Sequence, residues 1–185
     1  MRRLPDWLAS NGESCEGAEL TIRPKIEAAL SATADRLSPG SGAGTVKHAK
    51  NDLMTISGTS ENLDRRYANE DVVVASTAIF EAKHPDGDPV TIKKKHEGLL
   101  VVFADSFIFV RGIGFGAREV KALGKNAVTV EKVTTVIDGT QVPGLRITGR
   151  AGKPNFAAGI ALPKDASNPT EQAAVRDELY AALAG

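Results

Sequence analysis

From Asp71 to about Leu162 the sequence is a succession of short runs rich in Val, Ile, Thr and Phe, separated by turn-forming residues. Runs of this kind, bounded by Gly, Pro, Asn and Asp, are typical of β-strands. Because tight turns join many short strands, the pattern predicts an antiparallel meander, which must close or fold over to bury a face and its edges. The expected strands span residues 72–83, 90–97, 99–104, 107–112, 117–123, 127–137, 143–150 and 154–162.

One amphipathic helix is predicted after the strands. Asn168 is placed to cap it, Pro169 suits its first position, and Glu171 lies where a capping box has its acid. We expect the apolar stripe of this helix to pack into the mouth of the β-rich part. The stripe consists of Val175, Leu179, Ala182 and Leu183.

Residues 1–70 have a helical and loop-rich pattern, and residues 71–185 are expected to form the β domain. A helix is predicted over residues 24–37, with Pro24 in its first turn. A flexible connector is expected at 38–44, and a shorter helix at 60–67 with Thr59 or Ser60 as its cap. The segment 46–56 fits either helix or strand. The apolar face of the first helix is Ile26, Ala29, Leu30, Thr33 and Leu37.

Composition narrows the class of protein. The chain has 185 residues, 42% of them hydrophobic and 25% charged, which is ordinary for a globular protein. Its formal net charge of zero argues against a general nucleic-acid binder. The single cysteine, Cys15, excludes an intrachain disulfide and fits a reducing compartment. No run approaches the roughly 18 apolar residues that a membrane span needs, so we expect a cytoplasmic protein without a membrane span.

Motifs for catalysis or cofactors are weak. Residues 112–117 formally fit a G-x-G-x-x-A pattern, but the seven residues from Arg118 to Gly124 are too few for a crossover helix. A flexible connection between strands is therefore favoured over a nucleotide site. His48, His84, His96 and Cys15 lack metal-ligand spacing. We expect no cofactor, no metal and no enzymatic activity.

A basic cluster provides the candidate ligand-binding residues. Between Lys83 and Lys153 there are 12 Lys or Arg against 7 Asp or Glu. In a strand, Lys93 and Lys95 would share one face, and with Arg118 and Lys121 they could bind phosphate groups or an acidic protein. The other interpretation, which we favour, is that these lysines solubilise an edge strand and protect it from aggregation.

Four segments together resemble the bacterial pleckstrin-homology-like domain family, over roughly Gly98 to Leu183. They are 98–110, which resembles the opening hairpin, then 128–136 and 144–148, and 178–183, which resembles the closing helix. The resemblance implies an α+β fold, in which an antiparallel meander or partly open barrel is capped by a C-terminal helix and preceded by a helical extension. It also implies a module for binding or assembly.

The sequence therefore predicts a non-catalytic protein-interaction or assembly module of bacterial or phage type. Its partner would be another protein or a second copy, bound by β-augmentation or by helix docking. Two alternatives stay open. One is binding of an anionic lipid or phosphate ligand through the basic residues. The other is an enzyme whose pocket lies between the N-terminal segment and the sheet.

Overall fold

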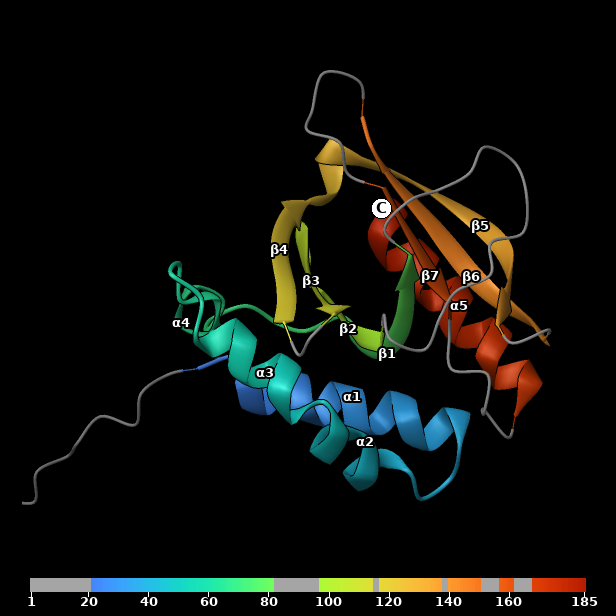
Figure 1. Cartoon of the computed structure of the whole chain (residues 1–185), viewed down its shortest axis with the longest axis horizontal. Coiled ribbons are helices and arrows are strands. Elements are labelled where there is room, and N and C mark those ends of the chain that lie inside the picture. The colour runs from blue at the N-terminus through green and yellow to red at the C-terminus, as the bar shows by residue number, and fades with distance from the viewer. Residues whose placement is uncertain (1–20, 82–96, 115–116, 138–139, 151–156, 162–167) are drawn as a thin grey trace, which may run out of the picture.

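The computed structural model describes residues 21–81, 97–114, 117–137, 140–150, 157–161 and 168–185. Figure 1 shows the N-terminal helices below and to the left of one curved sheet, and a long C-terminal helix behind it. The helices are α1 (Arg23–Leu37), α2 (Gly42–His48), α3 (Lys50–Ser57), α4 (Leu63–Arg66), the 3-10 turn η2 (Lys125–Ala127) and α5 (Pro169–Ala184). The strands are β1 (Val74–Glu81), β2 (Glu97–Val102), β3 (Ser106–Gly114), β4 (Ala117–Gly124), β5 (Val128–Ile137), β6 (Thr140–Gly149) and β7 (Ala157–Ala161).

The seven described strands form one sheet in the order β4-β3-β2-β1-β7-β6-β5. Every pairing is antiparallel, and β1 joins the two halves because it pairs with β2 on one side and with β7 on the other. The sheet is not closed within the described residues, where β4 and β5 are its two edges. This confirms the predicted α+β fold: an antiparallel meander in a partly open barrel, capped by a C-terminal helix and preceded by helices.

The concave face of the sheet packs against α5 and forms what we call the inner core. Leu179 is only 1% exposed and lies in this core, as the apolar stripe of the helix predicted. The helix begins as expected, because the Asn168 side chain accepts a hydrogen bond from the Glu171 N–H (3.2 Å) and Pro169 is the first helical residue. The inner core comprises Leu37, Val74, Ala78, Leu100, Val102, Phe107, Phe109, Val128, Leu145, Ile147, Val175, Leu179 and Leu183.

The opposite face of β1, β2 and β3 is covered by α1, α3 and α4, which together form the outer core. In β2, Leu99 and Val101 belong to this outer core, whereas Leu100 and Val102 belong to the inner one. A strand buried on both faces is apolar at every position, and this explains the unbroken run from Leu99 to Phe103. The outer core comprises Ile22, Ile26, Leu30, Ala49, Leu53, Ile56, Leu63, Tyr67, Ala75, Leu99, Val101, Phe103, Ile108 and Val110.

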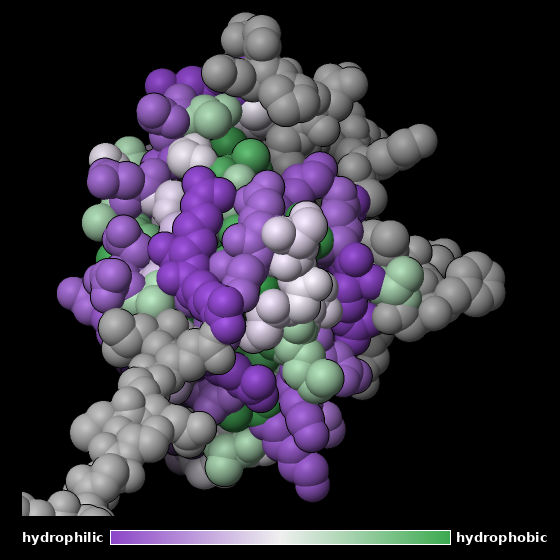
Figure 2. Space-filling view, turned by 90° about the vertical axis from the view of Figure 1, so that its left-hand side faces the viewer, coloured by the Kyte–Doolittle hydropathy of each residue, from purple (hydrophilic) through white to green (hydrophobic). Residues whose placement is uncertain are grey.

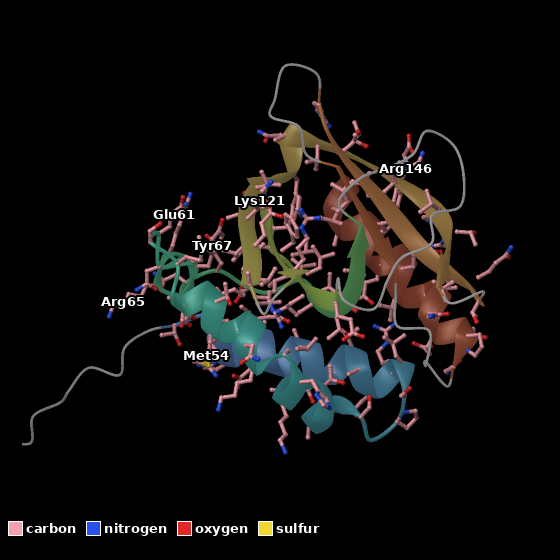
Figure 3. The ribbon with its side chains drawn as sticks, in the orientation of Figure 1. Met54, Glu61, Arg65, Tyr67, Lys121 and Arg146 are labelled. Atoms are coloured by element: carbon pink, nitrogen blue, oxygen red, sulfur yellow. The ribbon has the colours of Figure 1, made fainter. Side chains whose placement is uncertain are left out.

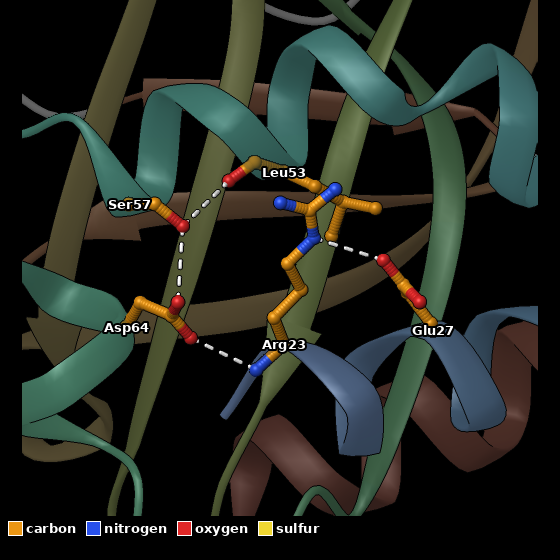
Figure 4. A network of polar contacts seen from close by, with 5 residues as sticks. All are labelled: Arg23, Glu27, Leu53, Ser57 and Asp64. Atoms are coloured by element: carbon orange, nitrogen blue, oxygen red, sulfur yellow. Dashed lines mark hydrogen bonds and ion pairs between the residues drawn. The ribbon is translucent and has the colours of Figure 1, made fainter. Parts of the chain in front are cut away.

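A buried carboxylate ties the N-terminal helices together (Figure 4). Asp64, 6% exposed, accepts a hydrogen bond from the Arg23 N–H (2.9 Å) at the start of α1. Its other oxygen accepts from the Ser57 hydroxyl (3.0 Å) at the end of α3, and that hydroxyl also lies 3.4 Å from the Leu53 carbonyl oxygen. Because α1 has no side-chain cap of its own, Asp64 supplies a partner for one of its free N–H groups.

An ion-pair bridge joins α1 to α5. Arg36 donates to Glu171 (3.0 Å) and to Glu178 (2.6 Å), so one guanidinium contacts two carboxylates on the C-terminal helix. All three side chains are substantially exposed, and exposed pairs contribute little to stability. The bridge therefore orients two elements that the apolar cores already hold.

Two helical expectations were wrong in detail. The predicted helix at 60–67 is only α4, and its cap is Asn62 rather than Thr59 or Ser60. Asn62 has a left-handed backbone (φ 44°), and its side chain accepts from the Arg65 N–H (3.2 Å). The Thr59 hydroxyl also contributes, because it accepts from the Leu63 N–H (3.3 Å) while it donates to the Ile56 carbonyl (3.1 Å). The expected connector at 38–44 ends early, because α2 already begins at Gly42, and the undecided segment 46–56 is helical.

The strand boundaries also differ in places. Apart from Glu97, which opens β2, the predicted strand at 90–97 lies outside the described residues, whereas β6 starts at Thr140 instead of Pro143. Proline lacks an N–H, so a strand is usually expected to start at it. Here the described pairing with β7 begins only at Gly144, so the missing N–H of Pro143 leaves the ladder intact.

Gly42 marks a close approach of α2 to α1. A Cβ added there would lie 2.8 Å from the Ser31 backbone oxygen and 2.5 Å from a carboxylate oxygen of Asp35. We expect Gly42→Ala to lower the free energy of unfolding by about 1–3 kcal/mol, because the backbone atom cannot move aside. Gly44→Ala is the matched control: a Cβ there has no neighbour within 4 Å, and alanine in a helix should add up to about 1 kcal/mol. Urea unfolding measures both, and equal stability of Gly42→Ala and the wild type would contradict the contact.

Candidate protein-interaction surface

The structure places only two of the four candidate ligand-binding residues. Arg118 and Lys121 lie on β4, whereas Lys93 and Lys95 lie outside the described residues. Residues three apart in a strand point to opposite faces. Accordingly Arg118 reaches α3 on the outer face, while Lys121 lies beside Glu119 on the other. β4 therefore does not bring these two cations together on one surface.

Arg118 is engaged in an ion pair with a buried carboxylate. Its Nε lies 2.5 Å from Oδ1 of Asp52, which is 7% exposed on α3. Burial raises the pKa of Asp52, and the hydrogen bond from Arg118 opposes that rise. The pair spans 66 positions of sequence and fastens edge strand β4 to α3. Sequence reasoning missed this partner because no local pattern links the two residues.

The carboxylate of Glu119 partly neutralises the positive charges of two further residues. It accepts a hydrogen bond from Arg111 (2.6 Å) and lies 3.0 Å from the Lys121 ammonium. Burial alone would raise the pKa of Glu119, but the hydrogen bonds from Lys121 and Arg111 outweigh it and the pKa is lowered. An ionised carboxylate thus sits between the two cations, which reduces the positive potential that a phosphate group would meet on this strand.

The β4 edge carries features that discourage pairing with another strand. Its register with β3 shifts between Gly112 and Gly114, as in a β-bulge. Half-buried charges, Arg118 and Glu119, lie along it. Figure 2 shows that the face carrying α4 and β4 is largely hydrophilic. Bulges and inward-pointing charges are the usual protection of an edge strand.

The β5 edge is different. β5 has ten residues, and its register with β6 runs without a shift from Val128↔Gly149 to Ile137↔Thr140. It contains no proline or glycine, and most of its residues are valine, isoleucine or threonine. A long, regular edge strand of this composition is a ready template for another strand.

The direction of the β5 backbone groups follows from one hydrogen bond. The Arg150 N–H donates to the Ala127 carbonyl (2.9 Å), so the register pairs 127 with 150 as a hydrogen-bonded pair. In an antiparallel ladder such pairs alternate with non-hydrogen-bonded ones. Odd-numbered residues of β5 therefore bond to β6, and even-numbered residues direct their N–H and C=O groups to the free edge.

The two charged residues of β5 are held by partners in the same chain. Glu131 pairs across to Arg146 on β6 (3.5 Å), which Figure 3 shows on that strand. Lys132 pairs with Asp177 on α5 (3.1 Å), and its ammonium lies 4.9 Å from the centre of the Tyr180 ring. Both side chains remain exposed, and their partners lie on β6 and α5.

No protein-family model matches this chain, and no curated protein matches it. In the part of the chain that the structure describes, no three His, Cys, Asp or Glu side chains gather as metal ligands would. None of the described helices is long and apolar enough to cross a membrane.

Proposed function

We propose that the protein is a non-catalytic protein-interaction module of the pleckstrin-homology-like kind, and that it binds an extended protein segment along β5. One observation carries the proposal: β5 is a ten-residue edge strand of unbroken register whose charged side chains are turned to partners within the chain. An incoming strand would complete hydrogen bonds that β6 cannot supply, which is the basis of β-augmentation.

The proposal predicts that a proline at position 134 abolishes binding. Thr134 is exposed, and as an even-numbered residue it directs its N–H to the free edge. Thr134→Pro removes this donor and blocks an incoming strand, while the ladder to β6 keeps its hydrogen bonds. Thr134→Ala is the matched control, because it alters the side chain and keeps the N–H.

A fluorescein-labelled peptide with the sequence of residues 128–137 serves as the probe in an anisotropy titration. We expect the wild type and Thr134→Ala to bind the peptide with similar affinity. Thr134→Pro should bind it with at least tenfold lower affinity. Equal binding by all three proteins, or no binding by the wild type at concentrations where sedimentation shows it to be monomeric, would contradict an edge-strand mechanism. Circular dichroism must show that Thr134→Pro keeps its fold.

The lipid or phosphate alternative gives a different result in vesicle sedimentation. Exposed charges are screened over about 8 Å at physiological ionic strength, so lipid binding would weaken with salt. The proposed function predicts no binding to vesicles of anionic phospholipid at low or high salt. The proposal would be overturned by salt-sensitive binding that Thr134→Pro leaves intact and that neutralising Lys93, Lys95 and Lys121 removes. Arg118 is kept in this variant because it pairs with the buried Asp52.

A further inference from the structure

Within the described residues, the backbone groups that β5 directs away from β6 are arranged symmetrically. Of its even-numbered residues, Val128 already has its carbonyl engaged, because Arg150 Nε donates to it (3.0 Å). Positions 130, 132, 134 and 136 remain, and their midpoint is Val133. An identical strand in antiparallel orientation, with its own Val133 opposite this one, would pair 132 with 134 and 130 with 136. All four positions of each strand would then be used.

The charged residues of β5 favour the same two-fold centre at Val133. A two-fold axis through Glu131 would oppose two glutamates, and one through Lys132 would oppose two lysines. Like charges directly opposite each other destabilise a strand pair. With the axis through Val133, valine faces valine and Lys132 faces the exposed Thr134 of the other strand. This register avoids direct repulsion between the charged residues of the two strands.

We infer that the segment bound along β5 is the β5 strand of a second copy of this chain, in a two-fold dimer centred on Val133. The inference rests on the proposed function and names its partner. A two-fold pairing uses the same surface of both copies, so both β5 edges become buried in the interface. The assembly is then a closed dimer, to which no third chain can add along β5. The two sheets would join into one continuous sheet across the axis.

Disulfide trapping tests the register directly. Position 133 bonds to β6, so opposite its counterpart it would form a non-hydrogen-bonded pair, with Cα atoms about 4.5 Å apart. That distance lies within the range of disulfides, about 4.4–6.8 Å. In a Cys15→Ser background we expect Val133→Cys to form a covalent dimer under mild oxidation. Thr129→Cys is the control: its two copies would lie eight residues out of register, about 27 Å apart, and stay unlinked.

Sedimentation velocity gives the second measurement. The wild type is expected to be a dimer, and Thr134→Pro a monomer of unchanged fold. A monomeric wild type with no Val133→Cys dimer would overturn this inference; if the labelled peptide still binds in a Thr134→Pro-sensitive way, the proposed function survives it. Equal cross-linking of Val133→Cys and Thr129→Cys would also overturn the inference, because it would show random collision or another register.

Discussion

Leu179→Asp is expected to unfold the protein at neutral pH. Leu179 is 1% exposed in the inner core, where α5 packs against strands from both halves of the sheet. Loss of the leucine alone would cost about 2–5 kcal/mol, and burying an unpaired carboxylate adds a further penalty. Since domains are stable by only about 5–15 kcal/mol, the sum should exceed or nearly exhaust the stability. Thermal denaturation followed by circular dichroism should show no cooperative transition.

Ala181→Asp provides the control on the same helix. Ala181 is exposed, so the same carboxylate there should leave the melting curve within a few degrees of the wild type. A Leu179→Asp variant that melts cooperatively at the wild-type temperature would show that α5 does not plug the inner core.

Leu30→Asp is expected to expose the outer core and to destabilise the sheet itself. Leu30 is 1% exposed on α1, within the cluster that covers Leu99 and Ile108. If residues 1–70 were a separable extension, this change would leave the strands intact. Because the strands are buried on both faces, we expect the amides of β2 and β3 to lose most of their protection in hydrogen exchange, together with those of α1.

Ala32→Asp tests whether a charge on α1 is harmful in itself. Ala32 is exposed on the same helix, so its variant should retain wild-type exchange protection. Protection of β2 and β3 that survives in Leu30→Asp would mean that the sheet folds without its helical cover.

The sequence predicted the elements better than their arrangement. Tight turns between runs of Val, Ile and Phe specify strands locally, and Asn168 followed by Pro169 specifies a helix start, so these elements were recovered. The cap at Asn62 was missed because Thr59, Ser60 and Asn62 are all good capping residues by type. Only the left-handed backbone of Asn62 distinguishes it, and that is a property of the folded loop.

The candidate surface was harder to predict, for a physical reason. A positive residue is a binding site only if its charge is left unpaired, and the partners of Arg118 and Lys121 depend on tertiary structure. Asp52 is distant in sequence from Arg118, and Glu119 is shared by cations of two strands. Likewise, the apolar pattern of β5 identifies a strand, but only the strand order shows that it lies at an edge.

The position of β1 between the two halves of the sheet has a consequence for folding kinetics. β1 pairs with β2, the next strand along the chain, but also with β7, so that Ile79 meets Ala161 from 82 positions away. The β1–β2–β3 meander can form early, whereas the β7 pairing must wait for a large loop to close, which is slow. Until then β1 is itself an open edge. The molecule is therefore most prone to strand-swapped association while it folds. Refolding at low protein concentration, or in the presence of a chaperone, should raise the yield of native protein.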